Sequence, residues 1–306
     1  MQNDLFEKAP VHKAYFSFAL PVVFSMVISL IYNMADTYFI AGTGNTNLVA
    51  GVSLGAPIFT LMIALGDIFG LGGSSVISRL FGQKKDEDGK RLSVFCFYGA
   101  IVCGVIVAAV MMIFRAPILQ VLGADSDTIV YASQYYTWLV LGAPFIILVY
   151  TPSNLLRTEG FAVGSMTGTV LGAVVNIILD PILIFGLAFF PKMGISGAAI
   201  ATGVGQLISL AVYLAFYFRG PVPVKLEARY KIPGGNTMKK LYGIGIPAIL
   251  NLALPSVMIF VLNGLLAQYS RSYVVILGIY YKLQTFLYFP ASGIIQGMRP
   301  VIGYNF

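Results

Sequence analysis

An apolar stretch at residues 172–186 contains the side chains of this chain that are best placed for chemistry: Asn176 and Asp180, followed directly by Pro181. On a helix, residues four apart stack on one face, so the amide of Asn176 and the carboxylate of Asp180 are expected to point the same way. Pro181 has no backbone N–H, and the carbonyl of Ile177 therefore lacks its usual helical partner. A carboxylate, an amide and a freed carbonyl in an apolar surrounding predict a site for a small cation or a proton.

A plain Asp-Pro helix break that faces water or a polar neighbour is the alternative interpretation of the same residues. A charge is costly inside a membrane, so an ionisable residue in a membrane span is by default a candidate for function. The choice between the two interpretations therefore depends on whether residues 172–186 lie in a membrane.

Composition places this chain among membrane proteins. Apolar residues make up 58% of its 306 residues and charged residues only 10%, whereas a soluble domain has about 25% charged residues. The mean hydropathy is +0.85. The net charge of +7 comes from basic residues in short connections between apolar runs, which indicates topology and excludes a nucleic-acid-binding face. Cys96 and Cys103 share one apolar segment, so no disulfide framework is expected.

Eight apolar runs are each long enough to cross a hydrocarbon core of about 30 Å. They lie at about 15–40, 48–78, 92–113, 129–152, 163–188, 194–218, 241–268 and 273–304. Fourteen Lys and Arg residues fall in the N-terminal segment and the even-numbered connections, against three in the odd-numbered ones. This bias predicts a multi-pass protein with a cytoplasmic N-terminus.

An internal repeat divides the chain. Proline and glycine residues of the first two spans recur 226 or 227 positions later in the last two: Pro21 and Pro247, Gly51 and Gly278, Gly66 and Gly293, Gly70 and Gly297. Six spans separate the copies, so both enter the membrane from the same side, as in transporters built from parallel repeats. We therefore predict a six-helix N-lobe at 1–218, a cytoplasmic linker at 219–240 and part of a C-lobe at 241–306. A complete second lobe would give twelve spans in roughly 440–460 residues.

Other polar residues within the spans are also candidates for function. Asp36 is preceded by Tyr32 and Asn33, and its depth in the outer half of the first span matches that of Asp180 in the fifth. Thr202 has a similar depth in the sixth span, about 12 Å from its outer end. The alternative interpretation of Asp36 is a carboxylate at the membrane interface, close to the outer end of the first span. Asp67 lies among small residues and is expected to be structural or to line a water-filled cavity, while Lys282 can snorkel or line the cavity.

Several segments along the whole chain form a familiar series: Phe6-Glu-Lys-Ala-Pro10, Tyr32-Asn-Met-Ala-Asp36, Gly73 to Gly82, Leu156-Arg-Thr-Glu-Gly160, Asn176 to Pro181, Gly197 to Thr202 and Pro300 to Asn305. In this order they resemble the multidrug and toxic compound extrusion (MATE) family in its bacterial branch. The resemblance implies an all-α membrane protein, a polytopic helical bundle with a six-helix N-lobe and the first two helices of a second six-helix lobe. It also implies antiport of amphipathic, often cationic, organic compounds against H⁺ or Na⁺.

The family's cation site maps onto Asp36, Asn176, Asp180 and Thr202. We expect Tyr32 and Asn33 to line the cavity and the first helix to bend at Pro21. Some family members use carboxylates in the C-lobe, but the seventh span here offers only Leu262 or Asn263 opposite Asp36 in the repeat. A coupling site in the four further spans of a complete second lobe stays an alternative.

Two other functions stay open on sequence alone. A flippase for lipid-linked precursors, from the wider superfamily, would line its cavity with Arg and Lys, and the middles of the first six spans have none. A receptor or an intramembrane enzyme is the third possibility, although the single histidine, His12, lies outside the spans and no catalytic pattern accompanies it. The expected protein is therefore a monomeric transporter of the bacterial cytoplasmic (inner) membrane. It would contact lipid, need no cofactor, and bind no metal other than Na⁺ at the cation site.

Overall fold

The computed structural model describes residues 6, 7, 9–124, 126–187, 189–220, 222, 224, 232–269 and 271–306, and for parts of 252–282 it describes the backbone alone. Ten labelled helices occupy most of this length. Their bounds are α2 Val11–Ala41, α3 Thr46–Gly82, α4 Asp86–Ile113, α5 Arg115–Val121, α6 Ile129–Leu141, α7 Ala143–Thr158, α8 Ala162–Phe185, α9 Ile195–Arg219, α10 Gly235–Ala267 and α11 Arg271–Asn305. The predicted all-α fold is confirmed.

Each predicted span corresponds to a helix, or in one case to a bent pair of helices. Five helices are individually long and apolar enough to cross a membrane, and the pair α6 and α7, bent by 49°, makes a sixth. The helices of the seventh and eighth predicted spans, α10 and α11, are 33 and 35 residues long, whereas a span needs about 20 residues. The short helix α5 was not predicted. The bend between α6 and α7 was not predicted either. It lies at Gly142, shortly before the proline in the first turn of α7.

Local sequence accounts for several helix ends. The side chain of Asn45 caps α3 by accepting hydrogen bonds from the backbone N–H groups of Asn47 and Leu48. Three acidic residues in the first turn of α4 interact favourably with the positive end of its dipole. Gly186 ends α8 in the left-handed conformation, which glycine adopts without strain. The helix continues through Pro181 to this point, so the Asp-Pro sequence does not break it.

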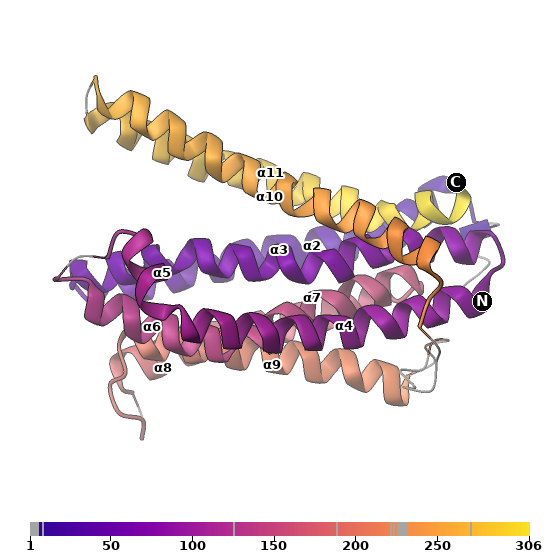
Figure 1. Cartoon of the computed structure of the whole chain (residues 1–306), viewed down its shortest axis with the longest axis horizontal. Coiled ribbons are helices and arrows are strands. Elements are labelled where there is room, and N and C mark those ends of the chain that lie inside the picture. Colours follow the sequence, from indigo (N-terminus) through magenta and orange to yellow (C-terminus); the bar gives the residue numbers. More distant parts are fainter. Residues whose placement is uncertain are drawn as a thin grey trace.

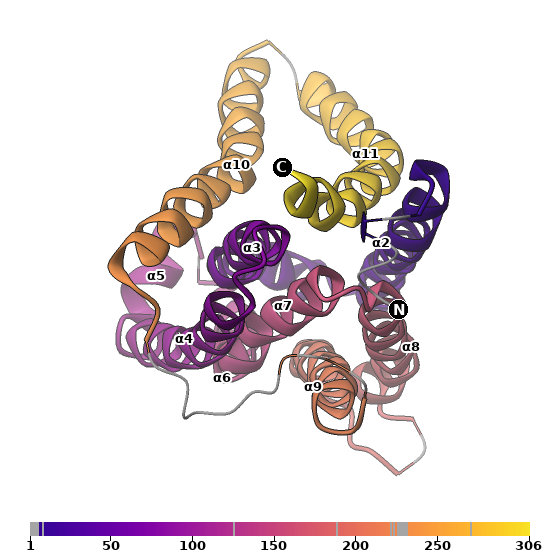
Figure 2. The ribbon, with the colours of Figure 1, turned by 90° about the vertical axis from the view of Figure 1, so that its right-hand side faces the viewer.

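The helices run roughly side by side along one axis, with α10 and α11 against one face of the first six spans (Figures 1 and 2). Both termini of the drawn chain lie at one end of the bundle, which we call the terminal end (Figure 1). Near this end, α10 packs on α3 and α11 packs on α2 and α3. At the opposite end, α10 and α11 lie apart from α2 and α3 (Figure 1).

Glycines allow the close contact at the terminal end. A Cβ atom added to Gly297 of α11 would lie 2.6 Å from the Cα of Ala19, and one on Gly293 would lie 2.7 Å from the Cα of Val23. A Cβ on Gly303 would clash with the hydroxyl of Ser78 in α3. The backbones of α11, α2 and α3 therefore meet with no room for larger side chains.

Nine of the 22 residues of the predicted linker, 219–240, lie outside the described residues. Its last part is helical, because α10 begins at Gly235, before the predicted start of the seventh span at residue 241. Pro21 lies inside α2, which continues from Val11 to Ala41, and the Ser25 hydroxyl donates a 2.9 Å hydrogen bond to the Pro21 carbonyl.

Candidate cation and substrate site

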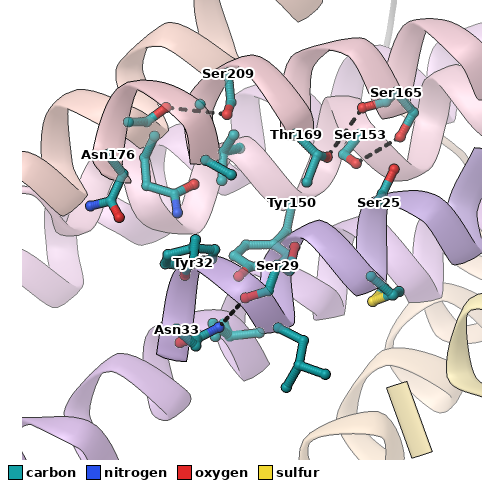
Figure 3. A pocket seen from close by; sticks show the side chains of 18 of the residues that line it. Ser25, Ser29, Tyr32, Asn33, Tyr150, Ser153, Ser165, Thr169, Asn176 and Ser209 are labelled. Atoms are coloured by element: carbon teal, nitrogen blue, oxygen red, sulfur yellow. Dashed lines mark hydrogen bonds between the residues drawn. The ribbon is translucent and has the colours of Figure 1, made fainter. Parts of the chain in front are cut away.

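A cavity of about 490 Å³ lies between α2, α3, α7, α8, α9 and α11. Small polar side chains line much of it, and aromatic rings such as Tyr32, Tyr150 and Phe289 supply apolar surface. Figure 3 shows Asn176, Tyr32 and Asn33 at one end of the view and Ser25, Ser153 and Ser165 at the other. The cavity can therefore accept an organic molecule that has both apolar and hydrogen-bonding parts.

Asn176 and Asp180 are both buried on α8, as their four-residue spacing predicts. Asn176 is 2% exposed and Asp180 is 0% exposed. Within the described part of the chain, neither carboxylate oxygen of Asp180 and neither polar atom of the Asn176 amide has a hydrogen-bond partner. Buried polar atoms almost always have a partner, so these four atoms fit a site where a proton or a small cation binds.

Asp36 of α2 lies near this pair. Its charge interacts with that of Asp180, and both charges act on the hydroxyl groups of Tyr32 and Tyr135. One oxygen of Asp36 is buried without a partner in the described structure. Two carboxylates that repel each other bind a cation or a proton more readily than either does alone. This place therefore has the charge and the free oxygens that a cation site needs.

Thr202 is buried on α9, on the same side as Asn176. A Cβ atom on Gly205 would lie 3.1 Å from the Cβ of Asn176, and Thr202 is three residues earlier, on the same face of the helix. Asn176 and Thr202 both line the cavity, as do Tyr32 and Asn33. Asp36 and Asp180 are not among the lining residues.

The structure thus brings the predicted site residues together around one end of the cavity. Asn263 and Lys282 are the polar candidates in the seventh and eighth spans, and their side chains lie outside the described residues. Leu262 is half-buried and does not line the cavity.

A second polar group, which we call the cavity floor, consists of Asp67, Asn154, Arg157 and Gln296. The Asn154 amide donates a hydrogen bond of 3.5 Å to Asp67. The Arg157 guanidinium donates one of 3.0 Å to the Asn154 carbonyl oxygen and one of 3.1 Å to the Gln296 side chain. All four residues line the cavity, which agrees with the prediction that Asp67 is structural or lines a cavity.

Sequence reasoning missed Arg157, which it placed in a connection after a span that ended near residue 152. The helix α7 instead includes Pro152 and continues to Thr158, so the side chain is 6% exposed inside the bundle. The sequence did contain a signal, because Arg157 belongs to the Leu156–Gly160 segment that resembles the MATE family.

The chain is therefore a polytopic helical membrane protein with a polar cavity and buried carboxylates beside it, the arrangement of a membrane transporter. Comparison with known proteins gives the family. A family model described as MatE matches residues 21–182, more than half of the chain, and the chain belongs to this family.

Individual relatives agree with this assignment. The multidrug export protein MepA of Staphylococcus aureus (strain NCTC 8325) is 34% identical over 301 residues, which are 98% of this chain and 66% of that protein. A solved multidrug resistance MATE family transporter in an outward-facing conformation has a TM-score of 0.90 and 26% identity, and covers 98% of this chain and 66% of that one. A MATE structure in a straight conformation has a TM-score of 0.91, again at 26% identity, with 98% of this chain and 66% of that chain covered. The chain spans slightly less than two thirds of the length of the relatives it matches.

Proposed function

We propose that this chain provides the cation site and much of the substrate cavity of an antiporter that exports amphipathic organic compounds across a bacterial cytoplasmic membrane. Uptake of H⁺ or Na⁺ drives the export. The observation that supports this function is the fully buried carboxylate of Asp180, which lies with Asn176 and Asp36 beside a cavity of about 490 Å³. The printed name of MepA, a multidrug export protein, points to the same activity.

In this proposal Asp36, Asn176, Asp180 and Thr202 bind the coupling ion. A proton would neutralise one of the two carboxylates, and Na⁺ would be held by their oxygens together with those of Asn176 and Thr202. The drug binds in the cavity, where Tyr32 and Asn33 contact it. Ion and drug affect each other because each favours a different conformation of the protein.

The lobes predicted from the repeat would supply the two conformations. In the described structure α10 and α11 pack on α2 and α3 at the terminal end and lie apart from them at the other end (Figure 1). With the N-terminus in the cytoplasm, this arrangement corresponds to an outward-facing state. The opposite state would require the terminal end to open, and a bend of α2 at Pro21 would change the shape of the cavity wall.

A flippase for lipid-linked precursors is less well supported. Such a protein needs several cationic side chains to bind a diphosphate, and among the described lining residues Arg157 is the one cation. Its charge is partly balanced by Asp67. One lining guanidinium, which shares Asp67 with the Arg299 side chain of α11, falls short of the several cations that a diphosphate site requires.

Dye efflux from vesicles tests the proposed function. The intact protein is placed in vesicles with an imposed H⁺ or Na⁺ gradient, and loss of a fluorescent cationic dye is followed over time. We expect Asp180→Asn to abolish gradient-driven efflux, because it keeps the shape of the side chain and removes its charge. Asp88→Asn is the matched control, since Asp88 is exposed in the first turn of α4. Normal efflux by the Asp180 variant would contradict the proposal.

A further inference from the structure

The Arg157 guanidinium in the cavity floor joins α7 to α11 directly and reaches α3 through Asn154. Arg157 of α7 donates three hydrogen bonds: to the Ser153 carbonyl at 3.3 Å, to the Asn154 side chain at 3.0 Å and to Gln296 of α11 at 3.1 Å. The first two partners belong to the same helix as Arg157. Gln296 belongs to the segment that the repeat assigns to the second half of the protein. This bond is therefore a polar link between the two halves.

The charge of Arg157 is partly balanced by the carboxylate of a residue other than Gln296, although the same carboxylate also interacts with Arg299 of α11. Asp67 of α3 interacts electrostatically with Arg157 and accepts a hydrogen bond from Asn154, which itself accepts one from Arg157. Gln296 is neutral and adds no charge. A break between Arg157 and Gln296 would leave the buried guanidinium with its charge partner, whereas a break between Arg157 and the Asp67–Asn154 pair would strand a buried charge.

The link lies where α11 is held closely against the first six spans. Gln296 stands between Gly293 and Gly297, whose backbones press on Val23 and Ala19 of α2. Farther along, toward its first residues, α11 lies apart from α2 (Figure 1). The polar link and the glycine contacts thus close the cavity at the same end.

We infer that Arg157 is a positioning residue of the transport cycle: by binding Gln296 it holds α11 against the cavity floor and keeps the terminal end closed. This inference rests on the proposed function, because only a transporter that opens alternately to both sides needs such a link. When the terminal end opens, the Arg157–Gln296 bond breaks, and Arg157 stays with Asn154 and Asp67.

A cysteine at position 25 reports the opening directly. Ser25 lines the cavity and lies two residues after Val23, which contacts Gly293. Ser25→Cys is introduced into the intact protein, and its reaction with a membrane-impermeant thiol reagent is timed from the cytoplasmic side of vesicles. The parent protein, which retains Cys96 and Cys103 and lacks the substitution, gives the background rate. The assay needs neither drug nor ion gradient, so it can succeed or fail independently of the efflux assay.

Two substitutions of Gln296 should move the labelling rate in opposite directions. Gln296→Leu removes the acceptor, and the loss of a hydrogen bond to a charged group favours the open state by about tenfold to a hundredfold. Gln296→Glu gives Arg157 a charged acceptor, a stronger bond, and should slow the labelling. Gln284→Leu is the matched control, because it makes the same change on the same helix at a residue that does not line the cavity and whose side-chain oxygen has no described partner.

The pattern of rates decides the inference. Faster labelling in Gln296→Leu and slower labelling in Gln296→Glu, with the Gln284→Leu rate unchanged, supports a link that holds the terminal end closed. A merely structural role would disturb the protein in the same direction with both substitutions. Equal rates for Gln296→Leu and Gln284→Leu, equal directions for the two Gln296 variants, or no labelling of position 25 in any variant would overturn it.

Discussion

Asp180 of α8 and Asp36 of α2 lie close enough for their carboxylate charges to repel each other. Asp180 is fully buried, and neither of its oxygens has a hydrogen-bond partner in the described structure. A pair of carboxylates in such a place is costly when both are ionised and becomes stable when a proton or a cation joins them. This relationship is the physical basis of the proposed coupling, and it defines which experiments matter.

Membrane topology can be tested without any assay of transport. Thr46 is the first residue of α3, and Asp88 lies in the first turn of α4, just beyond the other end of α3. Both residues are exposed. We expect a cysteine at position 46 to react with an impermeant reagent applied outside the cell and a cysteine at position 88 to stay unlabelled. The reverse pattern would show that the charge bias assigns the wrong orientation.

The glycine contacts at the terminal end predict a large effect of a single methyl group. In Gly297→Ala the new Cβ would lie 2.6 Å from the Cα of Ala19, a backbone atom that cannot move aside easily. We expect the free energy of unfolding to fall by about 1–3 kcal/mol, measured as a lower midpoint of thermal unfolding in detergent.

Gly243→Ala in α10 is the control for this change. A Cβ at that position meets nothing within 4 Å, so the substitution should be neutral or stabilising by up to about 1 kcal/mol. Helix propensity favours alanine at both positions, so an equal loss of stability in both variants would mean that the α11–α2 contact does not determine the result.

Glu159 predicts a dependence of stability on pH. It follows the last residue of α7, is 5% exposed, and accepts a 3.3 Å hydrogen bond from the Tyr217 hydroxyl. Burial raises the pKa of its carboxyl group to about 8. Between about pH 4.5, where an unfolded chain loses this proton, and pH 8, the folded protein keeps it. Stability should therefore fall as the pH rises through this window, and the loss is complete above pH 8.

Replacement of the carboxyl group tests this dependence. Glu159→Gln should be less sensitive to pH between pH 5 and 8, with unfolding midpoints recorded at steps across that range. Glu87→Gln, at an exposed glutamate of α4, should retain the slope of the parent protein. If Glu159→Gln keeps that slope as well, another group is responsible for it.

The fold was predictable because its signals are long and local. Eight apolar runs predicted the helical spans, and hydropathy sufficed because each run exceeds the length of a membrane crossing. The bend at Gly142 was missed because the apolar run continues through it, although Pro144 lies in the interior of that run, where a proline kinks a helix. The helix α5 was missed because only seven residues form it.

The site was predictable where it depends on one helix and not where it depends on several. The spacing of Asn176 and Asp180 places both on one face of α8, and both are buried there. The hydrogen bond from Arg157 to Gln296, by contrast, joins residues 139 positions apart. A single sequence gives the order of such residues and not which of them face each other, so the cavity floor emerged only from the packing of α3, α7 and α11.

Release of the coupling ion when the drug binds is the most direct test of the central claim, that Asp36 and Asp180 bind that ion. The intact protein, purified in detergent, is mixed with a cationic drug, and released protons are measured with a pH indicator in weak buffer, or released ²²Na⁺ by filtration. We predict that the parent protein releases the ion. Asp180→Asn and Asp36→Asn should release none, and Asp67→Asn, at a cavity carboxylate outside the proposed site, should still release it. Full release by Asp180→Asn would contradict the account.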